Sequence, residues 1–109
     1  MRADSTQGQL ETLLLGVMAD GPAHGYRVIE LLRERSGGAF DLPEGTVYPA
    51  LHRLERGGML ASAWDSESGR RRRVYRITEH GHAELAGSRE RWQRFSRAVG
   101  DVLGAPAGA

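Results

Sequence analysis

The sequence has no cysteine, no lysine, few aromatic residues and no long apolar run. Without cysteine there is no disulfide framework, no thiolate nucleophile and no cysteine-based metal site. No stretch approaches the roughly 20 apolar residues of a membrane-spanning helix, and the polar N-terminus lacks the apolar core of a signal peptide. We therefore expect a cytoplasmic protein, and 109 residues is the length of one domain.

The positive charge is concentrated in one part of the chain. The net charge is only +1, but residues 45–77 contain seven arginines against three acidic residues, an excess of four positive charges. All fifteen basic residues are arginine, whose planar fork donates two parallel hydrogen bonds to a phosphate or a guanine. A GC-rich genome, which favours arginine codons, is the simpler explanation of the bias itself.

The rest of the chain is organised around one predicted helix in this basic stretch. Its apolar residues recur at helical spacing, at Val47, Ala50, Leu51 and Leu54. Pro49 is tolerated only in the first turn of a helix, so we expect the helix to begin near Gly45 or Thr46. Its cap would be Thr46 or Glu44, and Gly57-Gly58 would end it.

A basic hairpin follows this helix. Side chains alternate over Leu60–Asp65 and Arg73–Ile77, on either side of a polar turn, which predicts two paired strands. Four consecutive arginines, residues 70–73, open the second strand. A helix with one basic, solvent-facing side and then a basic hairpin is the layout of a winged helix-turn-helix, in which the helix enters the major groove of DNA. The sequence thus predicts a mainly α fold with a small β-hairpin, a winged helix-turn-helix DNA-binding domain over residues 1–78.

Two further helices precede this unit. The first has an apolar stripe and stops at Asp20-Gly21-Pro22; the stripe is Leu10, Leu13, Leu14, Val17 and Met18. The second starts near His24 and closes at Ser36-Gly37-Gly38; its apolar residues are Tyr26, Val28, Ile29, Leu31 and Leu32. In the linker that follows, we expect Phe40 and Leu42 to pack onto the core.

The last helix is predicted to run from the N-cap Thr78 to about Leu103. Two interleaved heptad series run along it, and they form the predicted dimer interface: Leu85, Ser88, Trp92, Phe95, Val99 and Val102. Such series mark a seam for another helix, and a second copy of the chain is its natural partner. Residues 79–103 are therefore predicted to be a dimerisation helix, and residues 104–109 a disordered tail.

Several motifs taken together point to a known family. They are Gly21-Pro22 with His24-Gly25-Tyr26, the run GTVYPALHRLE at 45–55, residues 69–75, and Arg76-Ile77-Thr78-Glu79. In this combination the chain resembles the PadR family of bacterial transcriptional regulators, from about Leu10 to Leu103. The resemblance implies a homodimeric winged-helix repressor.

The predicted DNA contacts come from the central helix and the hairpin: Thr46, Tyr48, His52, Arg53, Arg70, Arg71, Arg72 and Arg73. The resemblance implies that Tyr48 touches a phosphate. His52 and Arg53 are candidates for base edges, because arginine to guanine is the commonest specific contact. Neighbouring strand residues face opposite sides, so two or three of the four hairpin arginines would reach one phosphate track. Arg56, at the far end of the helix, is interpreted as a partner of the helix dipole. The alternative for all of them is an ordinary solvated surface.

Trp92 leaves two interpretations open: a tryptophan packed in the dimer core, or a residue that stacks on a flat ligand between two subunits. In some short members of the PadR family, an aromatic residue of the last helix lines such a pocket. The resemblance therefore implies candidate effector-binding residues, which are Trp92, Phe95, Ser96, Leu10 and Leu14.

The remaining reactive side chains do not form a site. His24 is interpreted as a capping or packing residue at the start of the second helix. His80 and His82, two residues apart, do not share a helical face, and no third ligand accompanies them, so we predict no metal and no cofactor. No nucleophile–base pair is evident, and the protein is not predicted to be an enzyme.

These observations predict a transcriptional regulator that binds a pseudo-palindromic operator in double-stranded DNA. We expect a homodimeric repressor that a small planar aromatic effector releases from its operator. The alternatives are a winged-helix protein-interaction module without DNA binding and, less well supported, a ligand carrier. The basic hairpin favours DNA, because an interaction scaffold has no need of it.

Overall fold

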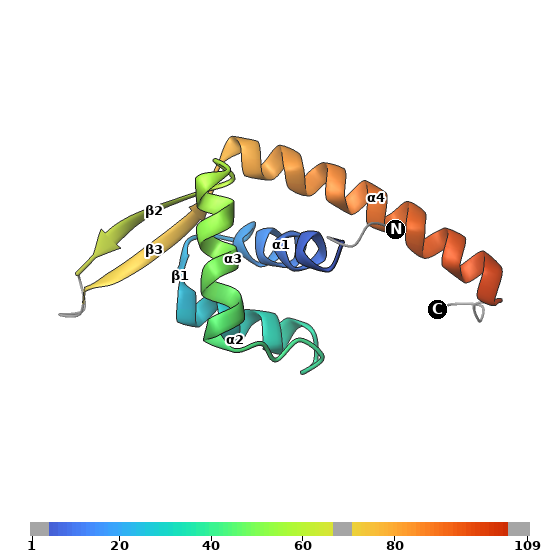
Figure 1. Cartoon of the computed structure of the whole chain (residues 1–109), viewed down its shortest axis with the longest axis horizontal. Coiled ribbons are helices and arrows are strands. Elements are labelled where there is room, and N and C mark those ends of the chain that lie inside the picture. The colour runs from blue at the N-terminus through green and yellow to red at the C-terminus, as the bar shows by residue number, and fades with distance from the viewer. Residues whose placement is uncertain (1–4, 67–70, 105–109) are drawn as a thin grey trace.

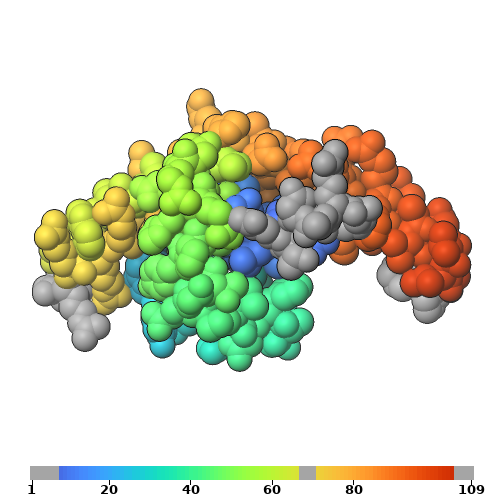
Figure 2. Space-filling model, viewed as in Figure 1, coloured from blue at the N-terminus to red at the C-terminus, as the bar shows by residue number. Residues whose placement is uncertain are grey.

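The computed structural model describes residues 5–66 and 71–104. Within these residues, the chain forms the helices α1 (Ser5–Met18), α2 (Gly25–Arg35), α3 (Glu44–Arg56) and α4 (Glu79–Leu103), and the strands β1 (Ala23–His24), β2 (Leu60–Asp65) and β3 (Arg72–Ile77). Helix α1 lies at the centre and contacts α2, α3 and α4 (Figure 1). We call β2, β3 and the described residues that adjoin them, Ser66 and Arg71, the wing. The wing and the C-terminal half of α4 project from opposite sides of the body, as Figure 2 also shows.

The core is built from the predicted apolar stripes. In α3 all four stripe residues are fully buried, which confirms the predicted register of the helix. Helix α1 contributes Leu14, Val17 and Met18 as predicted, and also Leu15, which the pattern did not include. Tyr75 of β3 is buried at the centre of the sheet face. These helices are therefore held by burial of apolar area, which stabilises by about 25 cal/mol per Å².

Helix α3 begins earlier than predicted. Its first residue is Glu44 and its N-cap is Pro43, which has no side chain to accept a hydrogen bond. The expected caps, Thr46 and Glu44, are wrong: both lie inside the first turn. Pro49 is thus in the second turn, where it leaves the carbonyl of the exposed Gly45 without its helical donor. Solvent at this exposed position can satisfy that carbonyl, which explains why the helix continues through the proline.

The sheet has three strands, not the two of the predicted hairpin. Antiparallel β2 and β3 pair from Leu60 with Ile77 to Asp65 with Arg72, as expected within one residue. The additional strand, β1, pairs with the other edge of β3 through Ala23 and His24. Two residues are too few to show an alternating pattern, so β1 had no sequence signal.

Helix α4 begins in close contact with the rest of the domain. The Thr78 hydroxyl accepts a hydrogen bond from the Gly81 amide at 3.0 Å, as predicted for an N-cap. The same hydroxyl donates to the carbonyl of Gly58, and the Thr78 amide donates to the carbonyl of Met59. Gly81 is buried there, and the helix ends at Leu103, as predicted, with Gly104 in the left-handed conformation.

Three expectations about packing change. Tyr26 and Phe40 were expected in the core, but they are 57% and 40% exposed, and only Leu42 of the linker packs on the core. Leu85 and Ser88 are buried against their own chain, so the packed core extends past residue 78 into α4.

None of the helices in the described ranges is long and apolar enough to cross a membrane.

Candidate DNA-binding surface

Helix α3 presents three different sides around its buried stripe. The side opposite the stripe carries Gly45, Pro49, His52 and Arg56, all of them exposed. One flank carries Arg53 and faces α1, where its Nε donates to Oε1 of Glu11 at 3.2 Å. The other flank carries Tyr48 and Glu55 and faces the wing. Thr46 is exposed in the first turn.

The Tyr48 ring lies against the start of α2. A Cβ atom at Gly25 would come within 2.5 Å of Tyr48 Cε1 and 2.7 Å of its hydroxyl oxygen, so only a glycine leaves room for this ring. Burial, then the nearby Glu44 carboxylate and Tyr26, raise the pKa of Tyr48. Tyr48 therefore keeps its proton at neutral pH and can donate a hydrogen bond to an anionic oxygen.

Trp64 of β2 supports two of the wing arginines. The guanidinium carbons of Arg71 and Arg73 lie 4.6 Å and 5.1 Å from the centre of its exposed ring. A cation over an indole face is attracted by the ring quadrupole, so both arginines are drawn to one face of the wing. This agrees with the predicted alternation along the strand.

Arg73 is the most constrained of these arginines. Its Nε donates to the Ser62 hydroxyl at 2.8 Å, and its NH2 lies 3.7 Å from the Glu55 carboxylate of α3. Ser62 in turn donates to the same carboxylate. Arg73 therefore connects the wing to α3, while the Arg71 side chain is exposed to solvent.

Arg72 contacts His24, which caps α2. His24 Nδ1 accepts a hydrogen bond from the Arg27 amide at 3.2 Å, which confirms the predicted capping role. NH1 of Arg72 lies 2.9 Å from Nε2 of the same ring. A neutral imidazole carries one proton, so its two nitrogens cannot both accept. Arg72 NH1 can only donate, so its contact requires Nε2 to accept, and a neutral His24 can either cap α2 or accept from Arg72 but not do both at once.

These side chains surround one open groove of about 690 Å³ between the wing and the N-terminal ends of α2 and α3. It is lined by His24, Gly25, Tyr26, Tyr48, Arg71, Arg72 and Arg73. None of these lining residues is acidic. A groove with three guanidinium groups, two phenols and an imidazole is suited to an anionic oxygen ligand such as phosphate. The predicted contact Arg70 lies outside the described residues.

The predicted dimer seam divides into two parts. Leu85 and Ser88 are 3% and 8% exposed, so they have almost no surface left for a partner. Trp92, Phe95 and Val102 are 58%, 47% and 84% exposed. The Trp92 and Phe95 rings are neighbours, with centroids 6.1 Å apart and planes tilted by 39°.

The candidate effector residues also differ in how exposed their side chains are. Leu10 is half-buried against the core and Ser96 is exposed. Leu14 is completely buried, so its inclusion among them does not fit the structure: a ligand could not reach it without opening the core.

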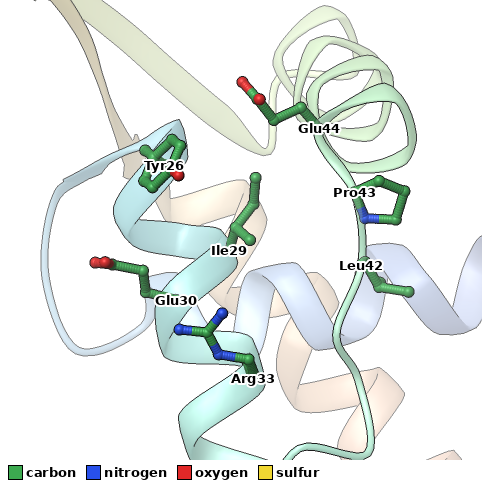
Figure 3. Close-up of a pocket in the computed structure, with 7 residues that line it drawn as sticks. All are labelled: Tyr26, Ile29, Glu30, Arg33, Leu42, Pro43 and Glu44. Carbon is green, nitrogen blue, oxygen red and sulfur yellow. The ribbon is translucent and has the colours of Figure 1, made fainter.

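A second hollow, of about 340 Å³, lies between α2 and the linker into α3 (Figure 3). Tyr26 and Ile29 line it from α2, and Leu42, Pro43 and Glu44 line it from the linker and the start of α3. Arg33, beside it, lies 4.0 Å from Asp41. No group of three or more potential metal-ligating side chains occurs in the described part of the chain.

Two features of this surface were missed from the sequence. Trp64 lies directly opposite Arg73 in the strand pairing, a register that the two predicted strands alone did not specify. The Glu11–Arg53 ion pair joins residues 42 positions apart, and no local sequence pattern predicts it.

Helices α1, α2 and α3 pack around the buried stripe of α3, and a three-stranded sheet carries the basic wing beside the exposed side of α3. This arrangement defines a winged helix-turn-helix protein. The chain belongs to the transcriptional regulator PadR-like family, whose family model matches residues 14–87. It is therefore a transcriptional regulator of this family.

Individual relatives agree with this assignment. A transcriptional regulator of Mycobacterium tuberculosis is 41% identical over 81 residues, which are 74% of this chain and 73% of that protein. The structure of a transcriptional regulator from Clostridium thermocellum is similar with a TM-score of 0.80 and 27% identity, over 93% of this chain and 96% of its own. A PadR family transcription regulator from Clostridium difficile R20291 gives 0.78 and 28%, over 86% and 97%. These proteins are regulators, not enzymes.

Proposed function

We propose that this chain binds double-stranded DNA as a homodimer and represses transcription from a pseudo-palindromic operator, in the cytoplasm. The observation that supports DNA binding best is the groove between α3 and the wing. It is lined by Arg71, Arg72 and Arg73 without an acidic residue, in a chain whose net charge is only +1. Phosphate contacts dominate the affinity of proteins for DNA, and arginine clusters are their usual source.

The mode of binding follows from the position of α3. Its outer face is exposed over its whole length and lies beside the groove, so the helix can enter the major groove while the wing follows the backbone. In this arrangement Tyr48, Arg71 and Arg72 contact phosphates, and Thr46 and His52 lie nearer the bases. Arg53 joins these contacts only if its ion pair with Glu11 opens.

The dimer is supported by the exposed end of α4. Trp92, Phe95 and Val102 form an apolar surface that their own chain leaves uncovered. Exposed apolar side chains in a row on one helix mark an association surface, and a two-fold dimer covers the same surface on both copies. Such a dimer presents two α3 helices, which bind half-sites about 34 Å apart on one face of the duplex.

The effector site would lie in the same seam. The neighbouring rings of Trp92 and Phe95 offer a stacking surface for a small planar aromatic molecule, with Ser96 and Leu10 as further candidates. Such a ligand releases DNA only if it binds more tightly to a dimer whose α3 spacing does not match the operator. Titration with planar aromatics should change Trp92 emission and lower DNA affinity together. If no compound in a broad panel changes either, the effector part of the proposal is abandoned.

DNA binding is tested by the salt dependence of affinity for the duplex upstream of the chain's own gene. The variant Arg71→Ala/Arg72→Ala removes two proposed phosphate contacts from each subunit. Removing one phosphate contact lowers the slope of log K against log salt by about 0.9, so the slope of a dimer should fall by up to about 4. The matched control is Arg94→Ala/Arg97→Ala, which removes the same charge from α4 at positions outside both heptad series.

The two variants should therefore behave differently. Wild type and the α4 control should bind with the same steep slope, and the wing variant with a shallower one. An equal reduction in both variants would show that only net charge matters. No preference for the upstream duplex in wild type, with a slope near zero, would favour a protein-interaction module instead.

A further inference from the structure

The polar side of α3 carries three side chains that can donate hydrogen bonds to DNA: His52, Arg53 and Arg56. At 100° per residue, positions 52 and 56 lie opposite the buried stripe, and position 53 lies on the flank that faces α1. The burial pattern agrees, because His52 and Arg56 are exposed while Arg53 is half-buried. The three are thus not equivalent candidates for contact with bases.

Arg53 is already committed within the chain. Its Nε donates to the Glu11 carboxylate of α1 at 3.2 Å, and the two side chains are only 32% and 26% exposed. To contact a base, Arg53 would have to leave Glu11. The unpaired carboxylate would then remain beside the DNA, where it would repel the phosphates.

Arg56 has no such commitment. It makes no hydrogen bond or ion pair with any residue in the ranges 5–66 and 71–104, and it lies one turn after His52 on the same face. The other two residues of the outer face, Gly45 and Pro49, have no hydrogen-bonding side chains. Direct readout of bases from this face therefore depends on His52, in its second half, and on Arg56, at its end.

We propose that Arg56, together with His52, reads base edges, and that Arg53 is a positioning residue that holds α3 on α1 through Glu11. The expected partner of Arg56 is guanine, whose O6 and N7 accept the two parallel hydrogen bonds of a guanidinium fork. This assignment rests on the proposed function, DNA binding through α3. It differs from an effect of Arg56 on the helix dipole, which would change stability but not sequence preference.

The test uses the sequence preference of the full chain. Wild type selects its preferred duplex from a random library, and affinities are then measured for that duplex, for its single base-pair variants and for a scrambled duplex. The variants are Arg56→Ala, Arg56→Lys, Arg53→Ala, Glu11→Gln and Arg53→Ala/Glu11→Gln. Thermal unfolding of each variant reports its stability. Arg56→Lys keeps the charge but lacks the fork, so it separates base readout from attraction to phosphate.

Arg56→Ala and Arg56→Lys should both lose roughly tenfold or more of the preference at one base pair of each half-site, with little change on the scrambled duplex. Arg53→Ala and Glu11→Gln should weaken binding by similar factors without changing the preferred bases. Their double variant should be no weaker than either single one.

The assignment is overturned if Arg53→Ala loses a base preference that Glu11→Gln retains. It is equally overturned if Arg56→Ala weakens the selected and scrambled duplexes by the same factor. A wild type that selects no sequence would instead overturn the proposed function, and this assignment with it.

Discussion

Replacing Gly81 by alanine tests the contact between the start of α4 and the wing. The new Cβ would lie 2.2 Å from the Met59 carbonyl oxygen and 2.7 Å from Ile77 Cγ1. An ordinary contact needs at least 3.4 Å, so the two segments must separate by about 1.2 Å. Met59 cannot simply turn away, because its carbonyl accepts from Thr78 and its amide donates to Leu54.

Three contributions set the size of the effect. Overpacking at a site that cannot relax costs about 1–3 kcal/mol, and disturbing the Thr78 cap costs about 1 kcal/mol more. Alanine in place of a helical glycine returns about 1 kcal/mol. The net destabilisation is about 2 kcal/mol, which in a domain of this size lowers Tm by about 8–16 °C.

Thermal unfolding followed by circular dichroism measures this destabilisation, at one fixed chain concentration because a dimer's Tm depends on it. Gly87→Ala is the control, since it lies in the same helix and its Cβ would meet only the end of the Arg91 side chain, at 3.3 Å. That variant should be as stable as wild type or up to about 1 kcal/mol more stable. Equal melting temperatures for the two variants would refute the tight approach at Gly81.

Two further predictions concern Tyr48 and Tyr75. Gly25→Ala should push the Tyr48 ring off α2 and weaken DNA binding with little change in the salt slope, because a neutral phenol releases no counterion from phosphate; an unchanged affinity would show that Tyr48 does not contact phosphate. Burial, and then Glu55, raise the pKa of Tyr75, although Arg73 acts in the opposite direction. Its stabilising effect is therefore complete below about pH 10, where unfolded tyrosine begins to ionise, and is lost as the pH rises through the higher folded pKa. Denaturant unfolding should show a steeper alkaline loss of stability in wild type than in Tyr75→Phe, and identical slopes would contradict this.

Local patterns predicted the elements of the fold well because burial enforces them. The stripe of α3, the cap at Thr78 and the length of α4 all depend on residues within a few positions of one another. The start of α3 was misplaced because an exposed carbonyl at Gly45 tolerates Pro49 in the second turn. Solvent exposure of that kind is a property of the folded surface and is not contained in the local spacing.

The seam of α4 shows a different limit of periodicity. A heptad series indicates which face of a helix is covered, but not by what. Leu85 and Ser88 are covered by their own chain, while Trp92 and Phe95, one heptad later on the same two series, are not. The point of change depends on where the rest of the domain ends, which only the tertiary structure determines.

The roles of the candidate site residues were harder to predict from the sequence, because they depend on partners far away in the chain. The wing arginines and the central helix were found from the charge excess, but their individual roles depend on their partners. Arg53 is paired with Glu11, and Arg73 with Glu55 and Ser62. Each partner lies on another element, so the sequence alone left the arginines equivalent.

The Gly58–Met59 corner has a mechanical consequence for the whole molecule. The end of α3 is attached to it through Met59 and Leu54, and the start of α4 through both hydrogen bonds of Thr78. Helix α4 is therefore joined to the end of α3 at this corner, and the burial of Leu85 and Ser88 fixes its first ten residues to the body as well. The part beyond Ser88 is roughly 22 Å long at about 1.5 Å per residue, so a movement of about 3 Å at its tip corresponds to a rotation of about 8°. A displacement at the far end of α4 therefore acts on α3 through both the corner and this packed half of the helix.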